Sequence, residues 1–214
     1  MARLQFLYRV IQEYLKTSFF NTEKDFSEKI QIIKYFKNQG TILDYGCSWG
    51  YGTWQLTEAG FDVLGFEVSK TRASFGRKKL GLKILDETTD LEQLQDESFH
   101  VIFTNHALEH LPNLFSIFDI FYNLLKVNGY LMIFVPNCIG LDNKKIFNLK
   151  KSYAFGEKHS LSLDRYFFET NLPKHGFEVK CASSPYDVKN LFAKKEDPYN
   201  AEYSELFVLA RKIS

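Results

Sequence analysis

Short apolar segments alternate with amphipathic segments over residues 41–135, and this alternation limits the fold more than any other feature of the sequence. The segments between the apolar runs repeat apolar residues at helical spacing, and several end at a glycine. Strands that alternate with helices build a parallel sheet covered by helices on both faces. Five segments are predicted strands: 41–44, 62–67, 82–85, 101–104 and 130–135.

The C-terminal part of the sequence follows a different pattern. Residues 164–175 are a predicted helix, and residues 177–183 and 205–211 are predicted strands. No helix of ordinary length separates these two strands, so we expect them to pair antiparallel. The predicted fold is α/β, Rossmann-like and doubly wound. Its sheet is seven-stranded and mostly parallel, with an antiparallel C-terminal strand pair and helices on both faces.

The N-terminal residues 1–40 are predicted to be helical. Apolar residues recur at helical spacing in two groups: Leu4, Leu7, Val10, Ile11, Tyr14 and Leu15, then Phe26, Ile30, Ile33 and Phe36. We interpret residues 1–40 as a helical lid segment and residues 41–214 as the ligand-binding domain, within a single domain overall.

Composition narrows the classes of partner. The formal net charge is +1, too small for the strong positive field of a typical nucleic-acid enzyme, so no nucleic-acid partner is expected. The three cysteines, at 47, 138 and 181, lack paired spacing, which argues against a disulfide framework and a metal site. No apolar stretch is long enough to span a membrane. We expect a cytoplasmic protein, either a monomer or a homodimer.

The segment ILDYGCSWGYGTWQL, residues 42–56, carries the main functional signal. A predicted strand ends in Asp44, a loop with Gly46, Gly50 and Gly52 follows, and a helix comes next. Glycines here let a ligand approach the backbone closely, and free amides at a helix start suit a carboxylate. The loop alone is equally compatible with a dinucleotide.

The second strand ends in Glu67, 23 positions after Asp44. An acid at this position accepts hydrogen bonds from the two ribose hydroxyls of an adenosine, so both NAD and S-adenosylmethionine remain allowed. Asp44 favours the second ligand, because a carboxylate there would repel a pyrophosphate and attract a sulfonium with its ammonium group. The glycine spacing also departs from GxGxxG.

Four segments in order resemble the class I S-adenosylmethionine-dependent methyltransferases, of the small bacterial type that includes ubiquinone-biosynthesis-like enzymes. The segments are LDYGCSWGYG, GFEVSKTRASFGRKKLG, DLEQLQDESFHVIFTNHALEHLPN and LLKVNGYLMIFVPN. Together they cover about residues 41–137. A strand that begins with Gly176 and Phe177 extends the resemblance.

The resemblance implies S-adenosyl-L-methionine as cofactor and assigns residues to it. Asp44 and Gly46 would line its methionine end, and Glu67 would bind the ribose. Asp90 would face the adenine amino group, with Leu91 offering its backbone. The full implied set is Asp44, Gly46, Cys47, Gly50, Glu67, Val68, Asp90, Leu91, Thr104 and Asn105, the last two bordering the methionine amino group.

Two residues depart from the family pattern, and three assignments have simpler alternatives. Ser48 stands where many relatives have Gly, and His100 where they have Asp. Asp44 could instead cap a helix, Glu67 could be a surface acid, and Asp90 could be a plain helix N-cap.

No catalytic residue is fixed by the sequence. Transfer of an activated methyl group is an in-line displacement that depends mainly on positioning, and a base is needed only for a protonated, weak acceptor. The candidates are His106, after the fourth strand, and His159, in the segment 138–163 where acceptor choice should reside.

The predicted function is methyl transfer to a small-molecule acceptor: a sugar, a quinone-like ring or a lipid precursor. Two alternatives stay open. One is a nicotinamide-dependent oxidoreductase on a similar sheet, and the other is a non-catalytic module that binds the cofactor.

Overall fold

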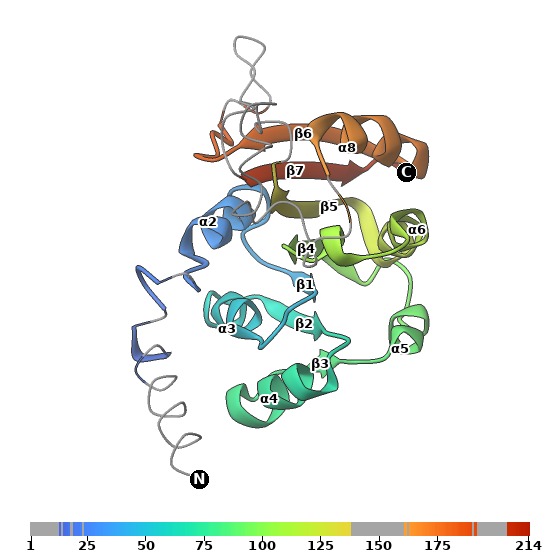
Figure 1. Cartoon of the computed structure of the whole chain (residues 1–214). Helices are drawn as coiled ribbons and strands as arrows, with labels where there is room; N and C mark the ends of the chain where they lie inside the picture. Colours follow the sequence, from blue (N-terminus) through green and yellow to red (C-terminus); the bar gives the residue numbers. More distant parts are fainter. Residues whose placement is uncertain are drawn as a thin grey trace, which may run out of the picture.

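A single seven-stranded sheet forms the centre of the computed structural model, in the order β3-β2-β1-β4-β5-β7-β6 (Figure 1). The structure describes residues 13, 15–17, 19–22, 24–137, 161, 163–189, 191 and 205–214. The predicted fold class is confirmed. The strands are β1 Thr41–Tyr45, β2 Asp62–Phe66, β3 Ile84–Leu85, β4 Phe99–Asn105, β5 Leu125–Pro136, β6 Phe177–Ser183 and β7 Glu205–Lys212.

Strand β7 is the antiparallel member of this sheet. It lies between β5 and β6 and runs against both, so the predicted antiparallel pairing of the last two strands is confirmed. In its register with β5, Glu205 lies opposite Pro136. The first residue of β7 is therefore placed at the edge of the sheet where the parallel strands end.

Helices cover both faces of the sheet (Figure 1). Alternate residues of a strand point to opposite faces. In β4, Val101 and Phe103 pack in one apolar cluster with Ile33 and Leu56, whereas Ile102 belongs to the opposite cluster. On one side lie α2 Ser27–Phe36, α3 Tyr51–Glu58 and α4 Lys70–Leu80, and on the other α5 Thr88–Glu92, α6 Leu114–Leu124 and α8 Arg165–Asn171.

Several boundaries differ from the sequence predictions for local reasons. β5 begins at Leu125, ahead of the predicted turn at Asn128 and Gly129. Asn128 takes a left-handed φ of 63°, beside a register irregularity between β4 and β5, so the turn signal marks a distortion within the strand. The predicted helix 164–175 changes to a 3₁₀ turn at Leu172, where Pro173 follows.

The N-terminal prediction is only partly covered by the structure. Helix α2 begins at Ser27 and buries Ile32 and Ile33, in agreement with the predicted helical spacing there. The apolar positions from Leu4 to Ile11, and Tyr14, lie outside the described residues. Among the helices that are described, none combines the length and the apolar character needed to cross a membrane.

His100, one of the two departures from the family pattern, has a structural role. Its Nδ1 accepts a hydrogen bond of 3.1 Å from the backbone amide of Thr41. The ring also lies so close to Gly40 that a Cβ there would approach it to 2.8 Å. His100 therefore fixes the start of β1 at the edge of the sheet opposite the strand ends.

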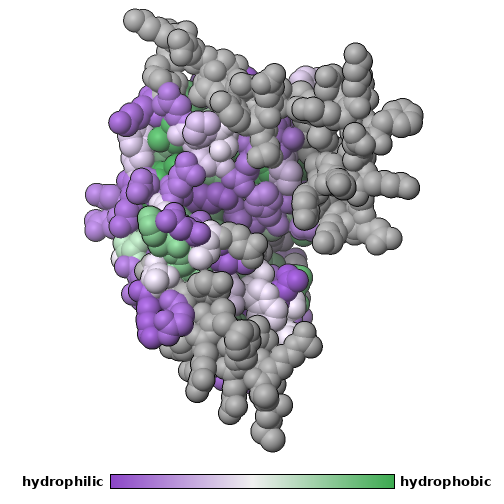
Figure 2. All heavy atoms as spheres, turned by 60° about the vertical axis from the view of Figure 1, so that its left-hand side comes forward, coloured by the Kyte–Doolittle hydropathy of each residue, from purple (hydrophilic) through white to green (hydrophobic). Residues whose placement is uncertain are grey.

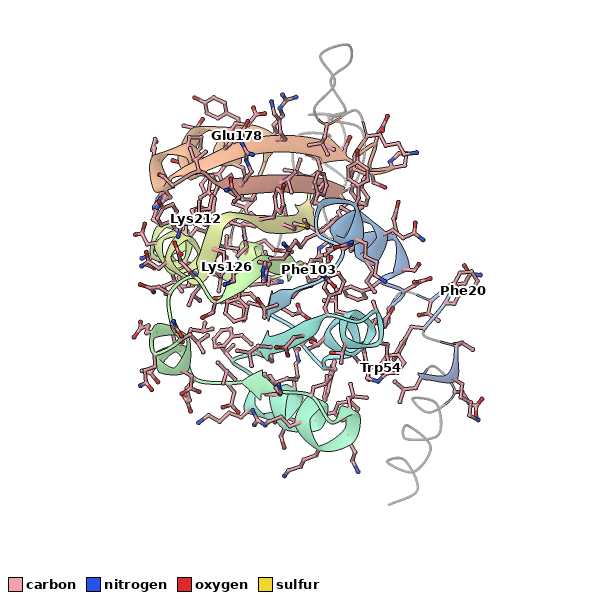
Figure 3. The ribbon with its side chains drawn as sticks, turned by 180° about the vertical axis from the view of Figure 1, so that it is seen from behind. Phe20, Trp54, Phe103, Lys126, Glu178 and Lys212 are labelled. Atoms are coloured by element: carbon pink, nitrogen blue, oxygen red, sulfur yellow. The ribbon has the colours of Figure 1, made fainter. Side chains whose placement is uncertain are left out.

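Lys212 at the end of β7 is a buried cation of this fold (Figure 3). Its Nζ donates to the carbonyl of Leu125 at 2.9 Å, and lies 3.4 Å from Glu97 and 4.4 Å from the ring centre of Tyr122. The side chain therefore ties the inner antiparallel strand to the beginning of β5.

We predict that Lys212→Met lowers the free energy of unfolding by about 1–3 kcal/mol, because the buried Leu125 carbonyl loses its charged donor. Arg211→Met is the matched control, since Arg211 forms a half-exposed pair with Glu178 at 2.6 Å. The control should lose less than about 1 kcal/mol. Urea unfolding of both variants measures the difference, and equal losses would contradict the role given to Lys212.

Candidate functional site

A cavity of about 290 Å³ opens at the carboxyl ends of β1 and β4. The sheet extends from β1 toward β3 in one direction and from β4 toward β6 in the other, and such a reversal of strand order is where ligands bind in open α/β sheets. The cavity is lined by the loop after β1, the residues after β4, the start of α2 and the first residue of β7. Figure 2 looks onto the side of the molecule that carries α2, where hydrophilic residues form much of the described surface.

The glycine-rich loop is held against the end of β2. The amides of Gly46 and Cys47 both donate to the carbonyl of Phe66, at 2.8 and 3.0 Å. Gly46 has a φ of +79°, and a Cβ at this position would lie 2.4 Å from the Cβ of Ala107. Gly50, at φ +86°, forms the N-cap of α3. The loop therefore needs glycine for its bend and for its close approach to the segment after β4.

Asp44 lies on the wall of the cavity with only 3% of its surface exposed. Its carboxylate accepts a hydrogen bond of 2.7 Å from the Thr53 hydroxyl. Helix α3 begins after Gly50 without a side-chain cap, so the helix-cap interpretation of Asp44 is wrong. Burial and, to a smaller extent, the charge of Glu67 raise the pKa of Asp44 to about 7, against the lowering effect of the Thr53 hydrogen bond. A cationic ligand in the cavity would offset the cost of burying the negative charge of Asp44.

Glu67 joins the loops that follow β1 and β2. One carboxylate oxygen accepts from the amide of Ser48 at 2.9 Å, and the other accepts from the amide of Ser69 at 2.8 Å. Only 7% of Glu67 is exposed, so the surface-acid interpretation is wrong. Each oxygen keeps a further lone pair for a ribose hydroxyl. Ser48 stands where many relatives have glycine. It nevertheless adopts φ +54°, in the backbone region that favours glycine.

The remaining residues of the predicted cofactor set are spread along the same edge. Asn105 lines the cavity, whereas Val68, Asp90 and Leu91 lie beyond it, on the side of β2 and β3. Val68 is 64% exposed and Leu91 is buried. The N-cap of α5 is Glu87, so the N-cap interpretation of Asp90 is wrong. The adenine-side roles stay predictions.

Thr104 and Asn105, neighbours at the end of β4, differ in what they contact. The Thr104 hydroxyl is fully buried and has no hydrogen-bond partner among the described residues. The Asn105 side-chain oxygen accepts a bond of 2.5 Å from Lys29 of α2. Of these two residues, only Asn105 lines the cavity.

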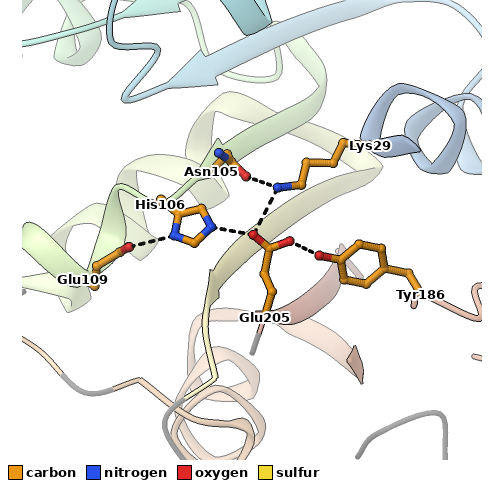
Figure 4. Close-up of polar contacts among 6 residues, drawn as sticks. All are labelled: Lys29, Asn105, His106, Glu109, Tyr186 and Glu205. Atoms are coloured by element: carbon orange, nitrogen blue, oxygen red, sulfur yellow. Dashed lines mark hydrogen bonds and ion pairs between the residues drawn. The ribbon is translucent and has the colours of Figure 1, made fainter. Parts of the chain in front are cut away.

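A polar network that the sequence did not predict contributes Lys29, Asn105, His106 and Glu205 to the cavity lining (Figure 4). Glu205 is at its centre. One of its carboxylate oxygens lies 3.1 Å from Lys29 Nζ and 2.5 Å from His106 Nε2, and the other accepts a hydrogen bond from the Tyr186 hydroxyl. The second ring nitrogen of His106 lies 3.4 Å from the carboxylate of buried Glu109.

His106, predicted to lie on the substrate side, does line the cavity, but its protonation does not suit a base. Burial lowers the pKa of His106, yet the hydrogen bonds and charges of Glu109 and Glu205 raise it to about 9. Burial raises the pKa of Glu205, whereas His106 and Lys29 bring it below its usual value. At neutral pH His106 is thus an imidazolium, which donates protons in hydrogen bonds. His159, the other candidate, lies outside the described residues.

Comparison with known proteins gives a family match over the middle of the chain. Residues 43–133 match the family model described as "Methyltransferase domain". A phosphoethanolamine N-methyltransferase 1 of Arabidopsis thaliana is 30% identical over 57% of this chain and 25% of its own length. A ubiquinone biosynthesis O-methyltransferase of Nitrosococcus oceani is 26% identical over 80% of this chain and 75% of its own length. The chain thus spans about a quarter of the Arabidopsis relative.

A comparison with solved structures finds the same fold. A crystal structure of a SAM-dependent methyltransferase from Archaeoglobus fulgidus has a TM-score of 0.67 at 18% identity, over 94% of this chain and 99% of that one. Residues 43–133 of this chain are thus similar to a methyltransferase domain, and the chain has the same fold as the Archaeoglobus protein. The resemblance seen in the sequence is confirmed. The family match favours a methyltransferase over the nicotinamide-dependent oxidoreductase.

We predict that Gly46→Ala destabilises the protein by more than 2 kcal/mol, roughly the sum of left-handed strain and the clash with Ala107. Gly81→Ala is the control, because Gly81 has a similar φ of +70° with nothing within 4 Å of its Cβ position. The control should lose only about 1–2 kcal/mol. Thermal and urea unfolding of the two variants compare these losses, and an equal effect would refute the close approach.

A second prediction concerns the stability of the ligand-free protein. Because the pKa of Asp44 is raised from 3.8 to about 7, the folded state holds a proton that the unfolded chain releases between these values. Protonated Asp44 therefore stabilises the folded state fully below about pH 4, and this stabilisation is lost as the pH rises to about 7. Asp44→Asn, which can still accept from Thr53, should therefore stabilise the ligand-free protein at pH 8 by about 1–3 kcal/mol.

Urea unfolding of wild type and Asp44→Asn at pH 4.5, 6 and 8 measures this difference. The gain from the substitution should shrink as the pH falls. A gain that is independent of pH, or a loss at pH 8, would show that Asp44 carries no unfavourable charge.

Proposed function

We propose that the protein binds S-adenosyl-L-methionine at the cavity between β1 and β4 and transfers its methyl group to a small-molecule acceptor. The observation that carries the proposal is the buried Asp44 carboxylate at the end of β1, which lines the cavity together with the polar residues Lys29, Asn105, His106 and Glu205. When bound, this cofactor supplies a methyl group on a positively charged sulfur.

The residues present fit such a cofactor. Asp44 offers a buried carboxylate to a cation, and Glu67 keeps acceptor capacity for ribose hydroxyls after binding two loop amides. Gly46 leaves room where any side chain would meet Ala107. Because these groups are fixed by the sheet ends before a ligand arrives, positioning can supply much of the rate. The adenine-side roles of Val68, Asp90 and Leu91 are part of the same proposal.

For the acceptor, we propose a sugar, a quinone-like ring or a lipid precursor. Support comes from the cavity, which is at the lower limit of the usual size for small-molecule sites, and from relatives named for phosphoethanolamine and ubiquinone biosynthesis. Since His106 is protonated at neutral pH, we assign it to orientation and charge balance, not to proton removal.

We further propose that residues 1–40 close one side of the cavity, as a lid on the domain formed by residues 41–214. Lys29 in the first turn of α2, and Asp25 and Phe26 just before that helix, already line it. A cytoplasmic location, a monomeric or homodimeric state and the absence of a nucleic-acid partner stay predictions.

Calorimetric titration with S-adenosylhomocysteine tests cofactor binding. We expect Asp44→Asn to weaken binding at least tenfold, about 1.4 kcal/mol, because the ligand's ammonium loses its buried counter-charge. Asp62→Asn is the control, since Asp62 is 70% exposed and lies 3.6 Å from Lys83 at the surface. The wild-type affinity should also fall below pH 7, where Asp44 becomes protonated.

Methyl transfer itself is tested with radiolabelled S-adenosylmethionine and a panel of candidate acceptors, analysed by mass spectrometry. Label in a small molecule would establish the enzyme. Binding of S-adenosylhomocysteine without any transfer across the panel would favour the non-catalytic module, and no binding at all would refute the proposed function.

A further inference from the structure

Three hydrogen-bond donors from separate parts of the fold surround the carboxylate of Glu205 (Figure 4). Lys29 comes from α2, His106 follows β4, and Tyr186 follows β6. Lys29 Nζ and His106 Nε2 share one oxygen, at 3.1 and 2.5 Å, while the other oxygen accepts a hydrogen bond from the Tyr186 hydroxyl. Two cations therefore crowd a single oxygen atom.

The two cations are held toward the cavity independently of Glu205. Lys29 Nζ lies 4.8 Å from the ring centre of Phe134 and 5.9 Å from that of Phe26, so the rings shield its sides from water. His106 has a left-handed φ of +50°, and Glu109 lies on the far side of its ring. Lys29, His106 and Glu205 all line the cavity.

These donors match an anion better than they match Glu205. A carboxylate or phosphate that enters from the cavity brings two or three oxygens, so each cation could take an oxygen of its own. Glu205 is the first residue of β7, so its strand restricts where its side chain can reach. It offers a single oxygen to both Lys29 and His106. The chain's own carboxylate thus resembles an internal stand-in for a ligand anion.

We propose that Lys29, His106 and Tyr186 form an anion subsite of the cavity, filled by Glu205 in the free protein, which receives a carboxylate or phosphate group of a ligand. The proposal rests on the proposed function, because the anion belongs either to the methyl acceptor or to the methionine moiety of the cofactor. Binding is an exchange of ion pairs in which Glu205 gives up its contacts with the two cations.

Inorganic phosphate is the first probe, measured by calorimetry on the full chain. Wild type should bind it weakly, and Glu205→Gln, which keeps the shape but removes the competing charge, should bind it at least fivefold more tightly. Lys29→Met should abolish detectable binding. Tyr186→Phe, which keeps the ring packed against Phe134 and Phe207, should weaken binding two- to fivefold.

Two control variants carry the same changes of charge elsewhere. Glu178→Gln removes a carboxylate paired with Arg211, and Lys83→Met removes a surface cation near Asp62. Both should bind phosphate as wild type does. Circular dichroism and the thermal midpoint identify variants that fail to fold, and the milder Tyr186→Phe then carries the test.

Two further ligands distinguish the sources of the anion. If Lys29→Met weakens S-adenosylhomocysteine about tenfold but leaves 5′-methylthioadenosine, which lacks the amino acid, unchanged, the anion is the cofactor's carboxylate. If phosphate still binds when S-adenosylhomocysteine is saturating, the subsite serves the acceptor.

Phosphate that binds Glu205→Gln no more tightly than wild type, or Lys29→Met as well as wild type, overturns the subsite. If S-adenosylhomocysteine binds neither wild type nor any variant, the cofactor proposal is refuted instead. The phosphate measurements then still decide whether the anion subsite exists.

Discussion

The site depends on one constraint, the burial of the Asp44 carboxylate at the end of β1. Asp44 is fixed there by the sheet, and its carboxylate accepts a hydrogen bond from the neutral hydroxyl of Thr53. An isolated buried charge is costly, and the raised pKa of Asp44 expresses that cost. Proteins often retain a destabilising residue where function requires it. The unfavourable burial of Asp44 therefore marks the cavity as a candidate functional site.

The surrounding loops are arranged to keep Asp44 in place. Phe66 at the end of β2 accepts from two amides of the glycine-rich loop, and Glu67 accepts from one amide of each adjoining loop. Most of this scaffold was predictable from sequence, because strand ends, glycines and acids are local signals. The strand positions of β1, β2, β4, β6 and β7 were predictable for the same reason, whereas the early start of β5 depends on a distortion that only its partner strand reveals.

The polar network around Glu205 could not be predicted in this way. Lys29 is one of three charged residues in the amphipathic helix α2, and Glu205 is the first residue of a strand more than 170 positions later. They meet because α2 packs on one face of the sheet and because β7 enters the sheet antiparallel beside β5. His106 was recognisable as a cavity residue from its place after β4. Its charge depends on Glu109 and Glu205, which no spacing rule brings together.

The place of β7 also affects how the protein is made. Of the seven strands it is the last in the chain, yet it pairs on both sides, with β5 and with β6. While a ribosome is still synthesising the segment before it, the apolar stretch from Leu131 to Val135 presents an unpaired strand edge. A nascent chain at this stage is open to wrong pairing with other chains, and chaperones that shield such edges would protect it until translation supplies β7.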